Sequence, residues 1–401
     1  MNKYLSSTLL TTLLASTAFA QSNGVIKENA ENSPYNPLNP AMMSLSIAPD
    51  ARGGGMGDVG AATDPDEVSQ YWNPAKYAFA YSRSGLSLNY TPWLRKIVSG
   101  INLMNVAGYY KFGYNDNQAV SASLTYFSLG EVTAYNSAGV EVQVINPMEM
   151  AVDVGYSRML SENFSMAVVF RYLHSAMTYT DNDNKPDNTF AADLAAYYEA
   201  YPQIGYNECK WAWGLNISNI GGKVSYDGGT TSQFLPTRMR LGTSFTFPID
   251  DYNLFSINAD ADKYLIPAAP KRTYFADDDE QGYQDALQDF YNTSGFQGIF
   301  KSFTDAPRGW KEELEEVTWG VGLEYTYDRR FFLRGGYHFE HENKGGRKYY
   351  TFGAGIALNI FHIDASYVLS SEQTSALDQT LRFTLGFDLE GLRDVMGGRR
   401  R

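Results

Sequence analysis

The sequence has very little of the residue types that build most metal and redox sites. It contains one cysteine, Cys209, and four histidines. A single cysteine excludes an intrachain disulfide and a cysteine-based zinc site. Acidic residues outnumber basic ones, 45 to 32, for a formal net charge of −13. Nucleic-acid binding depends on basic side chains that neutralise phosphates. We therefore expect no metal, no cofactor and no nucleic-acid partner.

Long hydrophobic runs are also missing after the first residues. Near the start, Lys3 precedes a short apolar stretch at 5–15, and Ala18-Phe19-Ala20 follows. A basic residue, a short apolar core and an A-x-A site form the pattern of a secretory signal peptide, whereas a membrane-spanning helix needs about 20 apolar residues. We expect residues 1–20 to be a signal peptide and the rest of the chain to be exported.

Aromatic residues and glycine are abundant: the chain has 30 Tyr, 23 Phe, 6 Trp and 36 Gly. From residue 85 onward apolar and polar residues alternate. Near the C-terminal end, for example, Leu381, Phe383 and Leu385 alternate with Arg382 and Thr384. A period of two is typical of β-strands with two unlike faces.

Two features favour a membrane barrel over a secreted, soluble all-β protein, which is the alternative. The alternating segments run about 9–11 residues, the length of a tilted membrane crossing, whereas ordinary strands average about 5–6. Charges also lie deep inside the segments, on the face opposite the aromatic one. In a membrane barrel this charged face lines the lumen and the apolar face meets lipid. The charges expected to face inward are Asp153, Arg171, Arg238, Arg240, Asp260, Glu324, Arg334, Asp364, Arg382 and Asp388.

The pattern predicts an all-β fold, an antiparallel transmembrane β-barrel of fourteen strands. Short and long connections alternate, as periplasmic turns and extracellular loops do in outer-membrane barrels. An even strand number then places both chain ends in the periplasm, and closure gives every backbone N–H and C=O a partner in lipid. The predicted strands are 85–93, 103–113, 118–128, 149–159, 164–173, 189–199, 210–219, 237–247, 253–262, 317–327, 330–340, 348–359, 361–370 and 379–389.

A glycine-rich stretch at 48–60 looks at first like a phosphate-binding loop. A phosphate loop of the Walker type ends in Lys and Ser or Thr, but here Gly57 is followed by Asp58 and Val59. Residues 21–84 instead precede the first predicted strand. Glycines allow positive φ and close backbone approach, which a segment packed against the lumen wall requires.

The same stretch carries a family resemblance. The run 52–80, RGGGMGDVGAATDPDEVSQYWNPAKYAFA, resembles the N-terminal hatch of the FadL family of outer-membrane barrels. That family has fourteen strands, and its N-terminal segment folds inside the barrel as a plug. The resemblance therefore implies a hatch at 21–84 inside a barrel at 85–390. The hatch motif comprises Arg52, Gly55, Gly57, Trp72, Asn73, Pro74 and Ala75.

Further segments narrow the resemblance to the PorV (LptO) family of the type IX secretion system. They are 87–113, 129–151, 213–229 (WGLNISNIGGKVSYDGG) and 234–242 (FLPTRMRLG). The resemblance implies an outer-membrane shuttle rather than an enzyme. Such a shuttle takes cargo with a C-terminal signal domain from a SprA/Sov-like translocon and delivers it to an attachment complex containing a PorU-like sortase. One departure is the basic tail at 391–401, since many barrels end on an aromatic residue.

One predicted extracellular loop, 263–316, is longer than structureless loops usually are. Apolar residues recur at helical spacing over 278–302, and the acidic run before them suits a helix N-terminus. Two interpretations stay open: the aromatics pack on the barrel rim, or they form a partner surface for cargo or translocon. The candidate residues are Tyr283, Leu287, Phe290, Phe296, Phe300 and Phe303.

Another predicted loop carries Lys344, Arg347 and Lys348 near the membrane surface. These cations are candidate contacts for lipopolysaccharide phosphates, the alternative being a solvated loop. Inside the barrel, the opposite charges are expected to pair and, with the hatch, to block the lumen.

Two other functions compete. A FadL-like transporter of hydrophobic compounds would need an apolar lumen pocket, whereas the predicted inward positions are charged or small. A lipid A deacylase would need a nucleophile, a base and an oxyanion site. His362, Asp364 and Ser366 share one face of a predicted strand, but such spacing arises often by chance. We therefore expect no catalytic residue.

Overall fold

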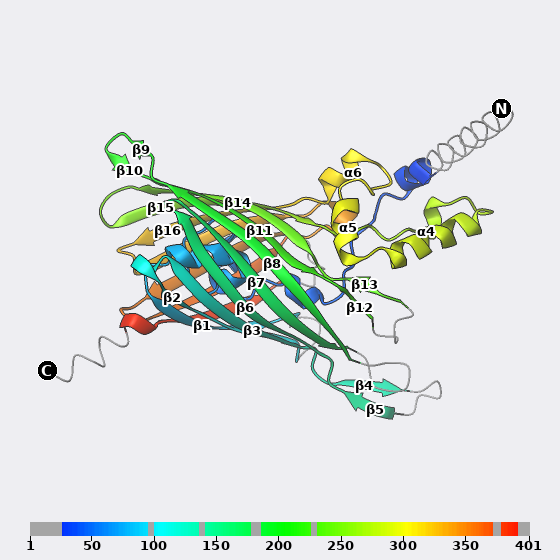
Figure 1. The fold of residues 1–401 in the computed structure, drawn as a ribbon, viewed down its shortest axis with the longest axis horizontal. Coiled ribbons are helices and arrows are strands. Elements are labelled where there is room, and N and C mark those ends of the chain that lie inside the picture. Colours follow the sequence, from blue (N-terminus) through cyan, green and yellow to red (C-terminus); the bar gives the residue numbers. More distant parts are fainter. Residues whose placement is uncertain are drawn as a thin grey trace, which may run out of the picture.

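Fourteen antiparallel strands close into one barrel, which confirms the predicted fold and strand number (Figure 1). The computed structural model describes residues 26–94, 100–135, 141–177, 186–225, 231–371 and 378–391. The expected signal peptide and all but the first residue of the expected basic tail lie outside these ranges. Closure comes from the pairing of the first barrel strand with the last. The barrel strands are β1 (Ser84–Pro92), β2 (Asn102–Phe112), β3 (Gln118–Ser128), β6 (Met148–Ser161), β7 (Phe164–Ala176), β8 (Asp187–Ala200), β11 (Lys210–Gly221), β14 (Arg238–Pro248), β15 (Asn253–Tyr264), β16 (Thr318–Tyr327), β17 (Phe331–Phe339), β18 (Lys348–Ala357), β19 (Phe361–Ser370) and β20 (Leu381–Asp388).

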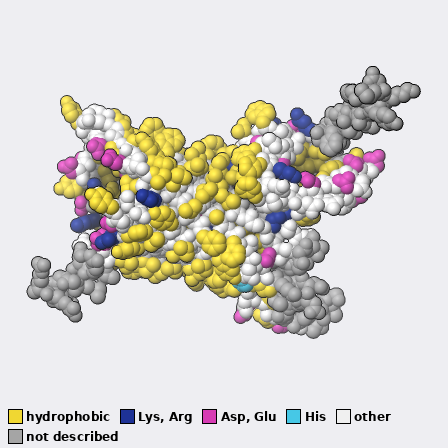
Figure 2. Space-filling view, in the orientation of Figure 1, with side chains coloured by type: hydrophobic (Ala, Val, Ile, Leu, Met, Phe, Trp, Pro, Cys, Tyr) yellow, Lys and Arg dark blue, Asp and Glu magenta, His cyan; other side chains and the backbone are white. Residues whose placement is uncertain are grey.

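The two faces of the wall differ as the alternation predicts. On β6, Val152 and Val154 are exposed on the outside while Asp153 between them is buried toward the lumen. The same inversion recurs around the barrel, and Figure 2 shows hydrophobic side chains covering most of the wall between the two ends. An apolar outside and a charged inside are the arrangement of a membrane-embedded barrel.

The two ends of the barrel carry different connections. We call the end with the short turns the inner mouth; it includes the residues after β20 and the small hairpin of β9 (Gln203–Ile204) and β10 (Asn207–Glu208). The other end, the outer mouth, carries the long loop between β15 and β16 (Figure 1). By the usual orientation of such barrels the outer mouth faces the cell exterior. Two short hairpins also lie there: β4 (Val132–Tyr135) with β5 (Glu141–Ile145), and β12 (Lys223–Val224) with β13 (Gln233–Phe234).

The long loop is mostly helical. It contains η4 (Arg272–Tyr274), α4 (Glu280–Asn292), α5 (Gly295–Lys301) and α6 (Trp310–Glu315). The expected helical pattern is confirmed, but it forms two helices, because Ser294 starts α5 with a reciprocal capping box to Gln297. Asp279 caps α4 by accepting a hydrogen bond from the backbone N–H of Gly282. No helix in the described ranges is long and apolar enough to cross a membrane.

The segment before β1 runs through the lumen. Residues 26–32 form a helix at the outer mouth, where Ala30 packs against Tyr274 and Phe275 of the long loop. The chain then forms η1 (Met43–Ser46), α2 (Ala51–Gly54), α3 (Ser69–Trp72) and η2 (Pro74–Phe79), and enters β1 from the inner mouth.

This path corrects one expectation. An even strand number places the two ends of the barrel itself at the same mouth, and the last described residues do lie at the inner mouth. The first described residues, however, lie at the outer mouth (Figure 1). The physical reason is that the segment before β1 crosses the lumen once, which strand counting cannot register.

Candidate functional site

Buried ion pairs fill the lumen. Arg171 lies between Asp153 (2.7 Å) and Asp193 (3.0 Å), and all three side chains are buried. On the other side of the barrel, Arg334 contacts Glu324 at 2.6 Å and also pairs with Asp364. Buried charges cost several kcal/mol each unless they are paired and hydrogen-bonded. The expected pairing of inward charges is thus present at these positions.

The first half of the hatch motif docks on β16–β18. Arg52 joins hatch to wall, with Nη2 3.1 Å from Glu324 and Nη1 3.1 Å from Asp66. The Gly57 N–H donates to Thr351 Oγ1 at 2.8 Å, and its φ is +79°. A Cβ at Gly57 would lie 2.7 Å from the carbonyl oxygen of Tyr337, so only glycine fits against this strand. Gly55 likewise lies against the backbone of β18.

The second half of the motif, Trp72-Asn73-Pro74-Ala75, ties the hatch to itself and to β7, β8 and β11. Trp72 is buried, and its indole N–H donates to Asp50 Oδ1 at 2.7 Å. The Asn73 amide donates to the carbonyl oxygens of Ala61 and Ala196, both at 2.9 Å. Pro74 begins η2 directly after Asn73, which caps it through the Ala75 N–H. The motif is therefore a structural latch.

Two further buried residues complete this latch: Asp260, which the alternation places on the inward face, and Lys76, which the sequence reasoning missed. Asp260 of β15 accepts from the backbone N–H groups of Gly60 (2.8 Å) and Ala61 (2.9 Å). Lys76 is fully buried and donates to Gly60 O at 2.8 Å and Thr63 Oγ1 at 3.1 Å. The position of Lys76 directly after Trp72–Ala75 was the only sequence signal.

A second set of ion pairs, which we call the outer platform, supports α6. It consists of Arg308, Glu312, Glu315, Glu316, Lys263, Lys344, Asn36 and Asn343. Lys344 Nζ lies 2.6 Å from Glu312 and 3.0 Å from Glu316. Burial acts to raise the pKa of Glu315, but hydrogen bonds from Arg308 and Asn343 lower it to about 2. The Asn36 amide donates a hydrogen bond to Glu312 (3.2 Å) and so ties the start of the hatch to this platform.

The candidate lipopolysaccharide contacts Lys344, Arg347 and Lys348 all pair with carboxylates of the protein itself. Lys344 is buried among carboxylates, and Arg347 pairs with Glu340 at 2.8 Å. Lys348 lies at the start of β18 and pairs with Glu342 at 2.7 Å. These cations already have carboxylate partners within the protein, because the loop carries its own acidic residues and α6 packs over it. We do not propose them as phosphate contacts.

The candidate partner-binding residues divide into two groups. Tyr283 and Phe290 pack on the protein: Tyr283 against Phe275, and Phe290 against Phe234 of β13. Leu287 is half-buried beside them. Phe296, Phe300 and Phe303 are 65%, 64% and 47% exposed. We call these three side chains the aromatic arm. The packing interpretation thus fits Tyr283, Leu287 and Phe290, whereas a partner surface on the three exposed side chains stays a prediction.

The 213–229 segment positions this arm. Lys223 Nζ donates to the last carbonyls of α4, those of Phe290 (3.2 Å) and Tyr291 (3.0 Å), and to Thr293 O (3.2 Å). Its ammonium also lies 4.2 Å from the ring centroid of Phe234. A lysine at helix C-terminal carbonyls complements the helix dipole. The α4–α5 corner, and with it the aromatic arm, is therefore anchored to the barrel.

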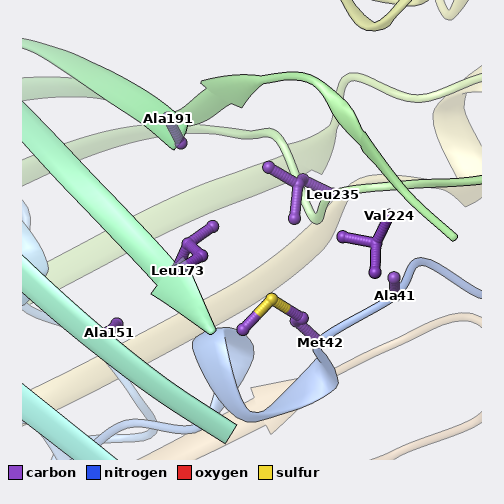
Figure 3. Close-up of a cluster of buried hydrophobic side chains, with 7 residues drawn as sticks. All are labelled: Ala41, Met42, Ala151, Leu173, Ala191, Val224 and Leu235. Atoms are coloured by element: carbon purple, nitrogen blue, oxygen red, sulfur yellow. The ribbon is translucent and has the colours of Figure 1, made fainter. Parts of the chain in front are cut away.

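A cavity of about 420 Å³ lies beneath the outer mouth. Met42, Met43 and Ile47 of the hatch and Trp93 and Phe127 of the wall give it an apolar side. Arg347, Tyr349 and Arg382 give it a polar side. Figure 3 shows Met42 close to Leu173 and Leu235, so the hatch seals the lumen beside this cavity with a buried hydrophobic cluster.

The residues considered for catalysis do not form a triad. His362 Nε2 is 3.4 Å from Asp364 and 3.7 Å from Glu67, but the buried Ser366 Oγ has no hydrogen-bond partner among the described residues. His362 also lies at the inner-mouth end of β19, far along the strand from the outer leaflet. Among the described residues no group of three or more His, Cys, Asp or Glu side chains is placed to hold a metal ion.

Several solved structures match this chain at low sequence identity. The Ralstonia pickettii toluene transporter TbuX is 13% identical, covering 85% of this chain and 97% of its own, with a TM-score of 0.45. A Pseudomonas aeruginosa FadL homologue is 10% identical (84% and 97% covered, TM-score 0.41). The Pseudomonas putida toluene transporter TodX is 9% identical (84% and 96% covered, TM-score 0.46). These similarities carry no information about function.

Comparison with curated protein sequences gives no match. Comparison with protein families gives one: residues 30–271 match the family described as type IX secretion system protein PorV. The matched range includes the hatch, the first nine barrel strands and the Lys223 anchor. Because the match spans more than half of the sequence, the chain belongs to the PorV family of type IX secretion system proteins.

Proposed function

We propose that this protein is an outer-membrane adaptor of type IX secretion. It binds cargo carrying a C-terminal signal domain at a SprA/Sov-like translocon and passes it to the attachment complex with its PorU-like sortase. Its N-terminal residues direct export as a signal peptide. In this role the barrel is a membrane-embedded scaffold and not an enzyme.

The observation that carries the proposal is the aromatic arm on a rigid support. Phe296 and Phe300 are about two-thirds exposed, although Lys223 fixes the chain just before α5 and a capping box fixes the start of α5. Exposed aromatic side chains on a fixed frame are common anchors of protein interfaces, because little conformational entropy is lost when they are buried.

The plugged lumen supports an adaptor over a pore. The hatch is fixed through Arg52 and Gly57 on one side and through Asn73 on the other. Passage of a polypeptide through this barrel would require these contacts to break together. The adaptor therefore presents its partners with its outer mouth.

A secretion assay tests the proposal. Cells whose chromosomal gene is replaced by a Phe296→Ser, Phe300→Ser, Phe303→Ser variant are compared with cells carrying Asp285→Ser, Gln288→Ser, two exposed α4 positions, as the matched control. We expect the arm variant to lose most surface-attached cargo at normal barrel abundance, and the control to secrete normally. Normal secretion by the arm variant would refute the role of the arm.

The cavity under the outer mouth favours a second candidate, uptake of a small hydrophobic compound. Its volume of about 420 Å³ lies within the range of ligand sites, and one side is apolar. Uptake of a labelled fatty acid by vesicles containing the wild-type protein and a Met42→Glu variant tests it. Equal, background uptake by both would remove this candidate.

A further inference from the structure

Helix α6 has its faces inverted relative to a helix in water. Its charged residues Glu312 and Glu315 are buried, at 1% and 9% exposure. Its apolar residues Trp310 and Leu314, four residues apart and so on one face, are 77% and 60% exposed. Helices on the surface of water-soluble proteins show the opposite arrangement. The strands of this barrel show the same inversion, with apolar residues outside and charges inside.

The buried face of α6 is fixed. Glu312 accepts from Lys344 Nζ (2.6 Å) and Asn36 (3.2 Å), and Glu315 pairs with Arg308. Rotating the helix to bury Trp310 would break all three contacts. The outward direction of Trp310 and Leu314 is therefore built into the platform.

The apolar face of α6 continues the lipid-facing wall. Only two residues separate α6 from β16, and the Val317 N–H donates back to Leu314 O at 3.3 Å. On β16 the outward series begins at Trp319, 52% exposed, and goes on through Val321 and Leu323. Figure 2 shows hydrophobic side chains over the position of α6, on the same side of the molecule as the apolar wall below it.

We propose that α6 is a membrane-surface anchor of the long loop, with Trp310 and Leu314 in contact with the acyl chains of the outer leaflet. Trp is favoured at the membrane–water boundary because its ring is apolar and its N–H is polar. The exposed Lys311 next to Trp310 is suited to reach lipid phosphates, as flexible lysines do at membrane surfaces. The anchor uses residues different from the aromatic arm and is independent of the proposed function.

A fluorescence experiment on the full chain in nanodiscs tests the anchor. On a Cys209→Ser background, Leu314→Cys carries an environment-sensitive dye of the nitrobenzoxadiazole type, and Gln288→Cys on exposed α4 carries the same dye as the matched control. Nanodiscs contain phosphatidylcholine and phosphatidylglycerol, with or without a nitroxide lipid labelled near the carbonyl. A Trp310→Cys variant provides a second position in case one label disturbs folding.

We expect blue-shifted emission at position 314, at least twofold quenching by the nitroxide lipid and protection from aqueous iodide. The label at 288 should show iodide quenching without lipid quenching. Equal iodide quenching at 288, 310 and 314, with no lipid quenching, would overturn the anchor. Protection of 314 only after addition of outer-membrane protein extract would also overturn it, in favour of a protein partner on α6.

Discussion

Truncating Trp72 should release the hatch from the barrel. Trp72 is 1% exposed, and the guanidinium carbon of Arg240 lies 4.5 Å from the centroid of its ring. Replacing a buried Trp by Ala costs about 3–5 kcal/mol. The same change removes the 2.7 Å hydrogen bond to buried Asp50, which costs about 1.5–3 kcal/mol more for a bond to a charged group. At about 1.4 kcal/mol per factor of ten, a loss of about 4.5–8 kcal/mol raises hatch opening at least a thousandfold.

Hydrogen exchange by mass spectrometry in nanodiscs measures this opening. The probes are the backbone N–H groups of Gly57, Gly60 and Ala61, which are bonded to Thr351 and Asp260 in the docked hatch. Trp72→Ala should speed their exchange by a factor of about a thousand or more. Trp72→Phe, which loses the hydrogen bond and part of the ring but keeps an aromatic side chain, should speed it less. Trp213→Ala on the lipid face of β11 is the matched control. Exchange of the probes in Trp72→Ala within tenfold of wild type would refute the latch.

Three further predictions concern the outer mouth. Burial raises the pKa of Asp305 to about 6. The folded loop therefore binds more protons than the unfolded loop between about pH 4 and 6, and it loses stability as pH rises through that window. Asp305→Asn should slow proteolysis of the loop at pH 7.5 and make no difference below pH 4. Lys344→Met removes one of the two cations beside each of Glu312 and Glu316, which keep Arg308 and Lys263. The cost is therefore at most the about 3–5 kcal/mol of a fully broken buried pair. Helix α6 should become more protease-sensitive, with partial rescue by adding Glu312→Gln, and no change in cleavage would contradict the platform. Tyr35 at the outer mouth and Tyr206 at the inner mouth are both exposed. On intact cells with a Cys209→Ser background, a membrane-impermeant maleimide should label Tyr35→Cys but not Tyr206→Cys. The reverse pattern would contradict the path of the hatch.

The barrel could be predicted from sequence because its signal is local. The strands bury polar, small or charged residues and expose apolar ones in alternation, and this period of two is visible within a ten-residue window. Predicted ends such as 118–128 and 361–370 coincide with β3 and β19. The others differ by one to three residues at one or both ends.

The candidate site could be predicted only in part, because its contacts join distant segments. Glycine and Trp-Asn-Pro-Ala identified the hatch, and the alternation placed Asp260 on the inward face. Nothing local in the sequence, however, shows that Asp260 binds Gly60 or that Asp50 binds Trp72. The charge of Lys344 looked available for a phosphate because nothing nearby in sequence shows Glu312 packing on it. The inverted face of α6 could not be predicted, because its buried side is set by Lys344 and Asn36, which are distant in sequence.

The central claim, an adaptor in type IX secretion, is tested most directly by native co-purification. The tagged wild-type protein is isolated from detergent-solubilised outer membranes of cells that secrete such cargo, and bound proteins are identified by mass spectrometry. The account predicts recovery of a very large barrel protein, a sortase-like protein and proteins that share a C-terminal signal domain. Recovery of the barrel alone would contradict it.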